Sequence, residues 1–383
     1  YIHAKILDED GRTMSKSHPE TCIDPVDVIE EFGTDALRFC IVTMATETQD
    51  VRLARTRFEM GRNLCNKIWN AARFVMMNLD GASGAEFKKS EMALEDRWIL
   101  SRLGGVRQAV TEDLEGYRFS AASDQLYNFF WHDMCDWYLE VIKPRLADAG
   151  SRPTAQRVLA FVLDNVVRLW HPFMCFQTEA IYQMLGRTIS DRSLPGIEEV
   201  SPAESIMISD WPGPNPDLAD TEAEETVAKV RELVTRVRNL RAEHKIPPQE
   251  KTSAVLKLSP EAGEKYGKLL QDSAAVICGF AGLDKFEFGA DVKAPEMGAS
   301  DVVGAMDGAV LTIARTIDPA VQRERLEREI AKLRVYLAES DGKLANENFT
   351  SRAPANVVQS ERERAEETRR NIAALEAELD ECS

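Results

Sequence analysis

Residues 61–74 read Gly-Arg-Asn-Leu-Cys-Asn-Lys-Ile-Trp-Asn-Ala-Ala-Arg-Phe. Small and apolar side chains recur here, and just beyond, at helical intervals: Leu64, Ile68, Ala71, Ala72 and Val75. This spacing lines one face of an α-helix that turns about once every 3.6 residues. The stretch therefore predicts a long amphipathic helix that buries this face against other helices.

The same periodicity continues further along the chain. It recurs at residues 95–112, at the aromatic-rich residues 120–140 and at residues 157–185, where we expect a bend near Pro172. Short polar connectors separate these helices. Residues 53–211 are therefore predicted to form a helical bundle.

The first 52 residues follow a different pattern, that of a strand, a loop and short helices. Residues 8–12 read Asp-Glu-Asp-Gly-Arg, in which Asp and Gly favour a tight turn. Asp24 and Pro25 are typical of an N-cap and a first helical residue. We expect Gly33 to end that helix and a second helix to begin at Thr34. Residues 1–52 are therefore predicted to be a separate region.

Residues 210–216 read Asp-Trp-Pro-Gly-Pro-Asn-Pro, which is typical of a linker and predicts a domain boundary. One helix is expected after it, at about residues 221–244. A strand-like segment at residues 254–258 then precedes a helix-like segment at residues 261–278. Two further strand-like segments follow, at residues 285–288 and 310–314. Residues 212–318 are therefore predicted to form a helix followed by a small α+β unit.

The last 65 residues carry two heptad seams. The first is Leu326, Ile330, Leu333 and Leu337, and the second is Ala365, Thr368, Ile372, Leu375 and Leu379. Residues 346–354 interrupt the period between the two seams. Because the connector is short, we expect residues 319–383 to fold back as an antiparallel coiled-coil hairpin.

Composition restricts the class of protein. The chain has 383 residues, of which 44% are apolar and 29% charged, and a formal net charge of −17. It lacks the run of about 18 apolar residues that a membrane span needs. None of its seven cysteines forms a CxxC pair, which argues against a structural zinc site and a disulfide framework. A reducing cytoplasm is expected, and the acidic charge argues against indiscriminate nucleic-acid binding.

The strongest candidate for chemistry is the loop at residues 11–17, Gly-Arg-Thr-Met-Ser-Lys-Ser. Lys16 can neutralise charge on a transferring nucleotide, and the hydroxyls of Ser15 and Ser17 can donate hydrogen bonds to phosphate. On composition alone, however, such a loop is more often a solvated turn.

This loop, which also contains Met14, resembles the Lys-Met-Ser-Lys-Ser signature of class I aminoacyl-tRNA synthetases. The Ile-Asp-Pro of residues 23–25 and the Gly-Thr-Asp-Ala-Leu-Arg-Phe of residues 33–39 follow it, as in that family. The resemblance implies that Lys16 contacts ATP phosphates during amino-acid adenylation, with Mg²⁺ accompanying ATP. The sequence departs from the pattern at Thr13, where the family has Lys, and at residues 18–21, where it usually has Gly-Asn. Loss of one cation would weaken stabilisation of pyrophosphate.

The resemblance extends along nearly the whole chain. Residues 61–74, 131–140 and 171–174 are similar to the anticodon-binding bundle of valyl and isoleucyl enzymes. Further motifs resemble the valyl branch specifically: residues 237–243, 246–248, 346–349 and 353–354. Isoleucyl enzymes more often end in a cysteine-rich zinc module, whose spacing is absent here. The chain is identified as a member of the valyl-tRNA synthetase family, and the resemblance implies that it is the C-terminal portion.

The resemblance implies a mainly α fold in four parts. The end of a class I, Rossmann-type catalytic domain precedes the helical anticodon-binding bundle, the small α+β connector and a coiled-coil arm on the outer corner of the tRNA. Implied partners are valine tRNA and, in the whole enzyme, ATP and valine, with no zinc, no membrane and a monomeric state. The chain starts with neither Met nor a signal peptide and has no His-x-x-His motif. We therefore expect a fragment that alone does not catalyse valine-dependent ATP–pyrophosphate exchange.

Two sets of cations are candidates for tRNA contact. The first recurs along the helix before Pro247, within an arc of about 80° and opposite four valines: Arg231, Arg238, Arg241 and Lys245. The second, weaker set is Arg62, Lys67 and Arg73. A solvated charged face is the ordinary interpretation of both sets, and the second could equally pair with carboxylates.

Other interpretations remain open. Trp131, Trp137, Tyr138 and Phe129 could stack on unpaired bases, although aromatic residues at helical spacing are more often core. Cys135 does not fit a catalytic pair, and His171 fits a structural histidine. The alternatives for the whole chain are an isoleucyl enzyme fragment and a non-catalytic helical module that binds RNA or protein.

Overall fold

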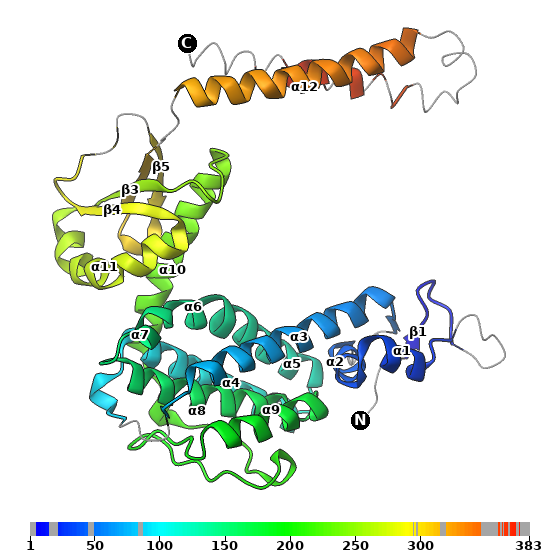
Figure 1. Cartoon of the computed structure of the whole chain (residues 1–383), viewed down its shortest axis with the longest axis vertical. Helices are drawn as coiled ribbons and strands as arrows, with labels where there is room; N and C mark the ends of the chain where they lie inside the picture. The colour runs from blue at the N-terminus through cyan, green and yellow to red at the C-terminus, as the bar shows by residue number, and fades with distance from the viewer. Residues whose placement is uncertain are drawn as a thin grey trace. The chain divides into compact units, whose positions relative to one another are not determined.

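The computed structural model describes residues 5–14, 22–44, 50–82, 87–293, 295, 298–314 and 319–345, and residues 359–360, 362, 364–366, 368–372 and 375 near the C-terminus. The described chain is mainly helical, with two small sheets (Figure 1). It divides into two compact units, residues 1–233 and 234–383. The predicted mainly α fold is confirmed.

The first unit begins with a two-stranded parallel sheet, β1 (Ile6–Leu7) and β2 (Val51–Arg52), and two helices, α1 (Pro25–Phe32) and α2 (Thr34–Met44). The side chain of Asp24 accepts a hydrogen bond of 2.8 Å from the Val26 amide and caps α1. Gly33 ends α1 with φ of 92°, a conformation that favours glycine. The predicted helix boundaries at Asp24, Gly33 and Thr34 are confirmed.

The helical bundle makes up the rest of the first unit (Figure 1). Its elements are α3 (Arg55–Asn78), α4 (Leu94–Glu115), α5 (Phe119–Asn128), the π-helix η4 (Phe129–Tyr138), α6 (Leu139–Val141), α7 (Lys143–Ala147), α8 (Arg152–Trp170) and α9 (Cys175–Thr188), with short 3-10 turns η3 (Lys89–Glu91), η5 (Ile206–Ile208) and η6 (Pro216–Leu218). The predicted apolar face of α3 is buried, with Leu64, Ala72 and Val75 fully inaccessible. Residues Thr154 to Trp170 of α8 are all buried, so α8 is the core helix of the bundle.

Two details of the bundle differ from the sequence prediction. The single bent helix expected at residues 157–185 is wrong: α8 ends at Trp170 and α9 begins at Cys175. Pro172 has no amide hydrogen to continue the helix, and the next two amides both donate to the Trp170 carbonyl, at 3.0 and 2.9 Å. The predicted helix at 120–140 is continuous but passes through the π-helical segment η4, which lies in its aromatic stretch.

The proline-rich residues 210–216 are held against α4 by hydrogen bonds. The Trp211 indole donates to the Thr111 hydroxyl at 2.9 Å. The buried Arg107 guanidinium donates to the carbonyls of Pro212 and Gly213, at 3.1 and 2.7 Å. The segment predicted as a linker is thus part of the packed first unit, and the chain continues into α10 (Thr221–Glu243).

The second unit contains a four-stranded sheet in the order β4-β3-β6-β5. The strands are β3 (Thr252–Lys257), β4 (Leu283–Gly289), β5 (Gly298–Val303) and β6 (Ala309–Ala314), with α11 (Pro260–Ala281) and the 3-10 turn η7 (Gly304–Met306) between them. β3 and β4 are parallel and joined through α11, whereas β6 runs antiparallel to both β3 and β5. The predicted strands and helix are confirmed, and β5 is an additional strand.

The arm consists of α12 (Pro319–Ala345) and helical residues between 359 and 375. Ile330, Ile372 and Leu375 form a buried cluster, against which Leu333 and Leu337 pack. Arg369 forms an ion pair of 2.6 Å with Asp341. Residues early in α12 thus pair with late ones in the second segment, as an antiparallel hairpin requires. Both predicted seams are confirmed for their described members; Leu379 and the side chain of Leu326 lie outside the described residues.

Candidate nucleic-acid interface

The loop with the signature-like sequence leaves β1 through a tight turn. The Asp8 amide donates to the Arg12 carbonyl at 2.9 Å, and the Arg12 amide donates to the Asp8 carboxylate at 2.6 Å. Gly11 lies between them with φ of 84°, which favours glycine. Thr13 pairs with Leu7 in an antiparallel bridge, so the tight turn predicted at residues 8–12 is confirmed.

Met14 is the last described residue of this loop, and it packs against the apolar cluster of α1, α2 and α3. Ser15, Lys16 and Ser17 lie outside the described residues. The start of the loop is therefore anchored to a core, while the contacts proposed for Lys16 remain a prediction.

The segment that carries this loop is tied to the bundle by charged side chains of α2. The Asp35 carboxylate accepts hydrogen bonds from the Phe176 and Gln177 amides, at 3.3 and 2.6 Å, in the first turn of α9. A carboxylate at a helix N-terminus satisfies free amides and the helix dipole. Arg38 donates to the carbonyls of Phe173 and Pro172, at 3.1 and 2.9 Å. Sequence reasoning assigned no contact to either residue, although both lie in the motif of residues 33–39.

The four cations predicted as one stripe near α10 have different environments. Arg241 is only 6% exposed, and its guanidinium donates to the carbonyls of Gly282, Pro247 and Glu250, at 2.7, 3.0 and 2.7 Å. Lys245 lies beyond the end of α10, with φ of 52°. Arg241 therefore joins α10 to its own unit, and the four residues do not form one exposed helical stripe.

Arg231 and Arg238 also have protein partners. In the first unit, Arg231 pairs with Asp133 at 2.6 Å and lies over the Trp137 ring, 5.1 Å from its centroid. In the second unit, Arg238 is exposed and donates to the Phe280 carbonyl at 2.9 Å. The four valines opposite the cations, Val227, Val230, Val234 and Val237, are buried as expected. Of the four cations, Arg238 and Lys245 are exposed.

The second candidate set lies on α3. Arg62 is exposed, and its guanidinium lies 5.3 Å from the Phe32 ring centroid. Arg73 is also exposed and lies on the same face of α3. At a rise of about 1.5 Å per residue, Arg73 is about 16 Å further along the helix. Lys67 lies about 140° away around the helix at about 100° per residue. It contacts Asp136 at 3.5 Å and lies 4.9 Å from the Trp131 ring centroid. The structure therefore brings Arg62 and Arg73 to one face and places Lys67 on another.

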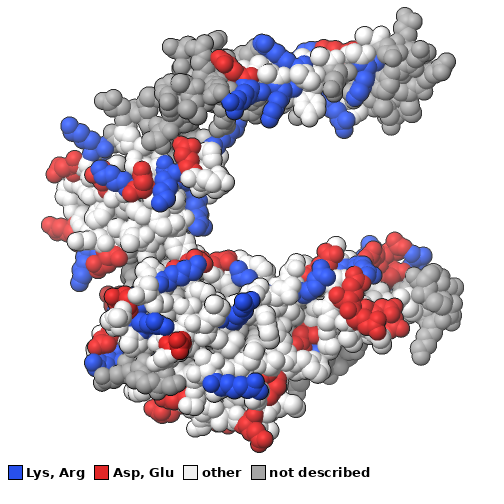
Figure 2. Space-filling view, viewed as in Figure 1, with Lys and Arg blue, Asp and Glu red and all other residues white. Residues whose placement is uncertain are grey.

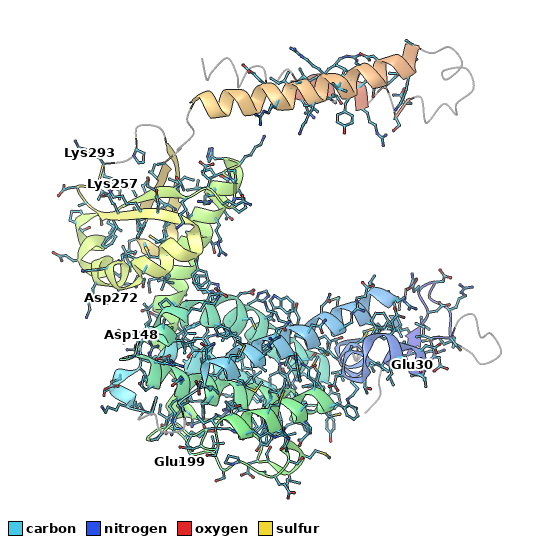
Figure 3. All side chains as sticks on the ribbon, viewed as in Figure 1. Glu30, Asp148, Glu199, Lys257, Asp272 and Lys293 are labelled. Carbon is cyan, nitrogen blue, oxygen red and sulfur yellow. The ribbon has the colours of Figure 1, made fainter. Side chains whose placement is uncertain are left out.

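Exposed cations also lie on the arm and the α+β unit. Figure 2 shows Lys and Arg side chains along the arm, where Arg328, Lys332, Arg334 and Lys343 of α12 are exposed. Figure 3 shows Lys257 and Lys293 at the surface of the α+β unit, away from α10. Positive surface charge on this acidic chain is thus present on both parts of the second unit.

The aromatic residues of η4 are mostly core. Phe129, Trp137 and Tyr138 are buried, as expected, and the Tyr138 hydroxyl donates to Asp96 at 3.2 Å. Trp131 is the exception, being half-buried. It is therefore the member of this group that can contact a ligand.

The titratable groups of the bundle have structural environments. Burial raises the pKa of the Cys135 thiol to about 12, which keeps it protonated and unreactive. The His171 ring shares a hydrogen bond of 2.8 Å with the Thr178 hydroxyl, and burial lowers the pKa of His171.

Within the described residues, no group of three or more His, Cys, Asp and Glu could hold a metal ion. No helix in the described part of the chain has the length and apolarity to cross a bilayer.

Three family models match successive parts of the chain. Residues 1–54 match the model of class I tRNA synthetases (I, L, M and V), residues 96–256 match the anticodon-binding domain of tRNA ligases, and residues 318–382 match the tRNA binding arm of valyl-tRNA synthetases. The three matches follow one another along the chain, in the order of a class I synthetase segment, an anticodon-binding domain and a tRNA binding arm.

Similar proteins are named valine–tRNA ligases. That of Rhodopirellula baltica is 35% identical over 99% of this chain and 40% of its own length, and that of Bacillus cereus is 37% identical over 98% and 42%. A solved LeuRS of Agrobacterium radiobacter K84, in a ternary complex with tRNA and LeuAMS, is 24% identical over 57% of this chain and 24% of its own, with a TM-score of 0.43. The chain spans about two fifths of the length of the curated relatives. It belongs to the valyl-tRNA synthetase family of class I aminoacyl-tRNA synthetases.

Proposed function

We propose that this chain is the tRNA-recognition portion of a valine–tRNA ligase. The observation that carries the proposal is the succession of a signature-loop segment, an anticodon-binding bundle and a valyl-type tRNA-binding arm in one chain. The whole enzyme would join valine to its tRNA at the expense of ATP, with Mg²⁺ accompanying the nucleotide. The identity of 35–37% to valine–tRNA ligases favours valine over isoleucine as the substrate, and the signature-loop segment argues against a free-standing module.

In this proposal Lys16 contacts the ATP phosphates, and Met14, Ser15 and Ser17 shape the loop around it. The ammonium group would offset negative charge that develops on the transferring nucleotide. Support comes from the anchored start of the loop, because the turn at residues 8–12 fixes where the loop leaves the core. The bonds from Asp35 and Arg38 to α8–α9 would then hold the loop in a fixed position relative to the bundle.

For tRNA contact we propose the exposed cations of both candidate sets, together with the arm. They are Arg62, Arg73, Arg238 and Lys245, with Arg328 and Lys332 on α12. Arg231, Arg241 and Lys67 would act mainly through their protein partners. We further propose four predicted domains (residues 1–52, 53–211, 212–318 and 319–383), a cytoplasmic location and a monomer without membrane attachment.

The test is binding of the chain to purified valine tRNA and isoleucine tRNA across a salt series. We expect tighter binding of valine tRNA, with affinity that falls as salt rises because cations release counterions from the phosphates. A double variant, Arg238→Ala with Lys245→Ala, should weaken binding and reduce the salt slope by about 2, or about 1 per phosphate contact. Equal binding of both tRNAs, or no binding, would contradict the proposal.

A further inference from the structure

A cavity of about 300 Å³ opens in the first unit beside the N-terminal turn of α10. Its walls are formed by α4, by the 3-10 turns η3 and η6, by the loop that contains Ile197 and by the start of α10. This volume lies at the lower end of the range of roughly 300–1,000 Å³ that is usual for small-ligand pockets. The cavity is therefore of the right size for a small organic molecule, and no role proposed above uses it.

The walls of this cavity are held in place by contacts within the first unit. The Asn215 side chain accepts a hydrogen bond from the Asp217 amide at 3.0 Å and donates one to the Glu198 carboxylate at 2.7 Å. Gly104 lets η6 approach α4 closely, because a Cβ atom at Gly104 would lie only 3.1 Å from the Cβ of Leu218. The cavity is thus preformed, and a ligand that enters it does not have to order the walls.

The apolar part of the lining is aliphatic. Leu100 and Leu218 are buried, and Met92 and Ile197 are half-buried. Among the described residues that line the cavity, none is aromatic. An aliphatic group of a ligand gains free energy by leaving water here, whereas a flat ring finds no stacking partner. The lining therefore favours a ligand with an aliphatic side chain.

The polar part of the lining contains charges of both signs. The Arg97 guanidinium is offset within the protein, because it contacts the Asp220 carboxylate at 2.8 Å and the Glu222 carboxylate at 3.7 Å. Lys89 and Asp217 also line the cavity, and in the described part of the chain neither side chain has an ion-pair partner. The cavity thus offers one cation and one carboxylate that the described protein groups do not offset. A ligand that carries both a negative and a positive charge can pair with both.

We propose that this cavity binds a small aliphatic α-amino acid in its zwitterionic form. The ligand carboxylate contacts the Lys89 ammonium, the ligand ammonium group contacts the Asp217 carboxylate, and the aliphatic side chain lies against Leu100 and Leu218. The lining contains three carboxylates and two cations, so a ligand with only a negative charge is disfavoured. The inference goes beyond the function proposed above, because it concerns a small molecule and uses none of the residues proposed for tRNA or ATP contact.

The first experiment titrates the full chain with L-valine and follows the methyl signals of the protein by NMR. The signals of Met92 and Ile197 should shift in a saturable manner, with a Kd of about 1 mM or lower. Met207 is the internal control, because it is 78% exposed and does not line the cavity. Its signal should stay in place. No saturable shift of Met92 and Ile197, or an equal shift of Met207, would overturn the inference.

The second experiment measures the Kd for L-valine in variants of the lining. Ala219→Trp places a large side chain at an exposed position of the lining and should weaken binding at least about tenfold. Lys89→Gln should weaken binding about 3- to 5-fold, as expected for the loss of one exposed ion pair. Lys88→Gln is the matched control, because Lys88 is exposed, pairs with Glu91 at 3.3 Å and does not line the cavity. Wild-type affinity in Ala219→Trp, or equal effects of the two lysine variants, would contradict the inference.

The third experiment separates a site for a zwitterion from a site for a single charge. Isobutylamine lacks the carboxylate of valine and 3-methylbutanoate lacks its ammonium group, so both should bind more weakly than valine. Asp217→Asn should weaken binding of the amine but not of the acid, and Lys89→Gln should do the reverse. An amine that binds as tightly as valine, or variants that affect both analogues equally, would show that the ligand class is wrong.

The melting temperature of each variant identifies any loss of binding that comes from unfolding. None of these measurements uses tRNA, so a negative result would leave the proposed function untouched. Conversely, failure of the chain to bind valine tRNA would contradict the proposed function and leave this inference standing.

Discussion

The core helix α8 and the arm helix α12 differ in how much of their surface is buried. In α8 every residue from Thr154 to Trp170 is buried, whereas Ile330 is the one buried residue among the described side chains of α12. The buried helix carries acidic and basic side chains inside the protein: Asp164 is fully buried and contacts Arg168 and Arg192, each at 2.6 Å. Among the described side chains of the arm helix, Glu327 and the four cations Arg328, Lys332, Arg334 and Lys343 are exposed.

This difference indicates a division of tasks. Asp164 on α8 forms ion pairs with Arg168 and Arg192 inside the bundle, and these pairs help to fix its packing. The described cations of α12 are exposed, which leaves them accessible to a phosphate group. The stability of the arm accordingly depends on one narrow apolar seam. The stability of the bundle depends on a core that surrounds its central helix, α8. All six tryptophans lie between residues 69 and 211, so tryptophan fluorescence reports on the first unit alone.

The largest effect is expected from breaking the buried charge cluster. Asp164→Ala leaves Arg168 and Arg192 without their buried counter-charge and should destabilise the first unit by about 3–5 kcal/mol. Urea unfolding followed by tryptophan fluorescence measures this loss. Glu140→Ala is the control, because it breaks an exposed pair of the same unit, Glu140–Lys143 at 2.5 Å, and should cost about 0–1 kcal/mol. Similar losses in both variants would refute the distinction between buried and exposed charge.

The next largest effect should be confined to the arm. Ile330→Ala removes the buried side chain of the seam and should destabilise the hairpin by about 2–5 kcal/mol. Circular dichroism at 222 nm should show loss of helix at lower urea, while the tryptophan transition stays unchanged. Val335→Ala, at a position 61% exposed on the same helix, should leave both signals unchanged. A shift of the tryptophan transition by Ile330→Ala would mean that the arm is not an independent part.

A smaller effect is expected in the α+β unit. Arg241→Ala leaves three carbonyl groups without their charged donor and should destabilise this unit by about 1.5–3 kcal/mol. Arg238→Ala removes an exposed side chain with one hydrogen bond and should cost less than about 1 kcal/mol. Thermal unfolding followed by circular dichroism compares the two variants. If Arg238→Ala proved the more destabilising, the structural role assigned to Arg241 would be wrong.

The smallest effect concerns pH and the adjacent carboxyls of Glu95 and Asp96. Burial raises the pKa of both groups, and the nearby Asp96 charge raises that of Glu95 further, although Arg145 opposes the shift. A carboxyl with a raised pKa binds a proton more readily in the folded protein. Its contribution to stability is therefore greatest at or below the unfolded-state pKa and falls as pH rises through the raised folded-state pKa.

Glu95→Gln tests this pH dependence, because it keeps an acceptor for Arg145 and removes one of the two charges. We expect the variant to be at least as stable as wild type at pH 7 and to show a weaker pH dependence in tryptophan-monitored urea titrations. A clear loss of stability at pH 7 would show that the Glu95 charge stabilises the bundle.

Local patterns predicted the features that depend on neighbouring residues in the sequence. Helix α1 begins after Asp24 and ends at Gly33, as expected. The apolar spacing in α3 and α12 correctly identified the buried faces of these helices. The sequence predicted a bend near Pro172 but not the end of one helix at Trp170 and the start of another. A proline in a helical stretch permits either a kink or a new helix. The strand β5 was missed because its sequence, Gly-Ala-Ser-Asp-Val-Val, begins with residues that are poor strand formers.

The candidate site was harder to predict, because the role of a cation depends on distant groups. Arg241 fits the same helical spacing as Arg238, yet its partners include the carbonyl of Gly282, 41 residues away. Arg231 finds Asp133, 98 residues earlier. Sequence spacing locates a basic face but does not distinguish a cation that binds its own chain from one that remains exposed.

The most direct test of the account compares valine tRNA binding by the wild-type chain, Ile330→Ala and Val335→Ala. If the bundle supplies the scaffold and the arm contacts tRNA, Ile330→Ala should weaken binding at least fivefold, with no change in tryptophan-monitored stability. Val335→Ala should bind within about twofold of wild type. Unchanged affinity in Ile330→Ala, with circular dichroism showing a melted arm, would contradict the account.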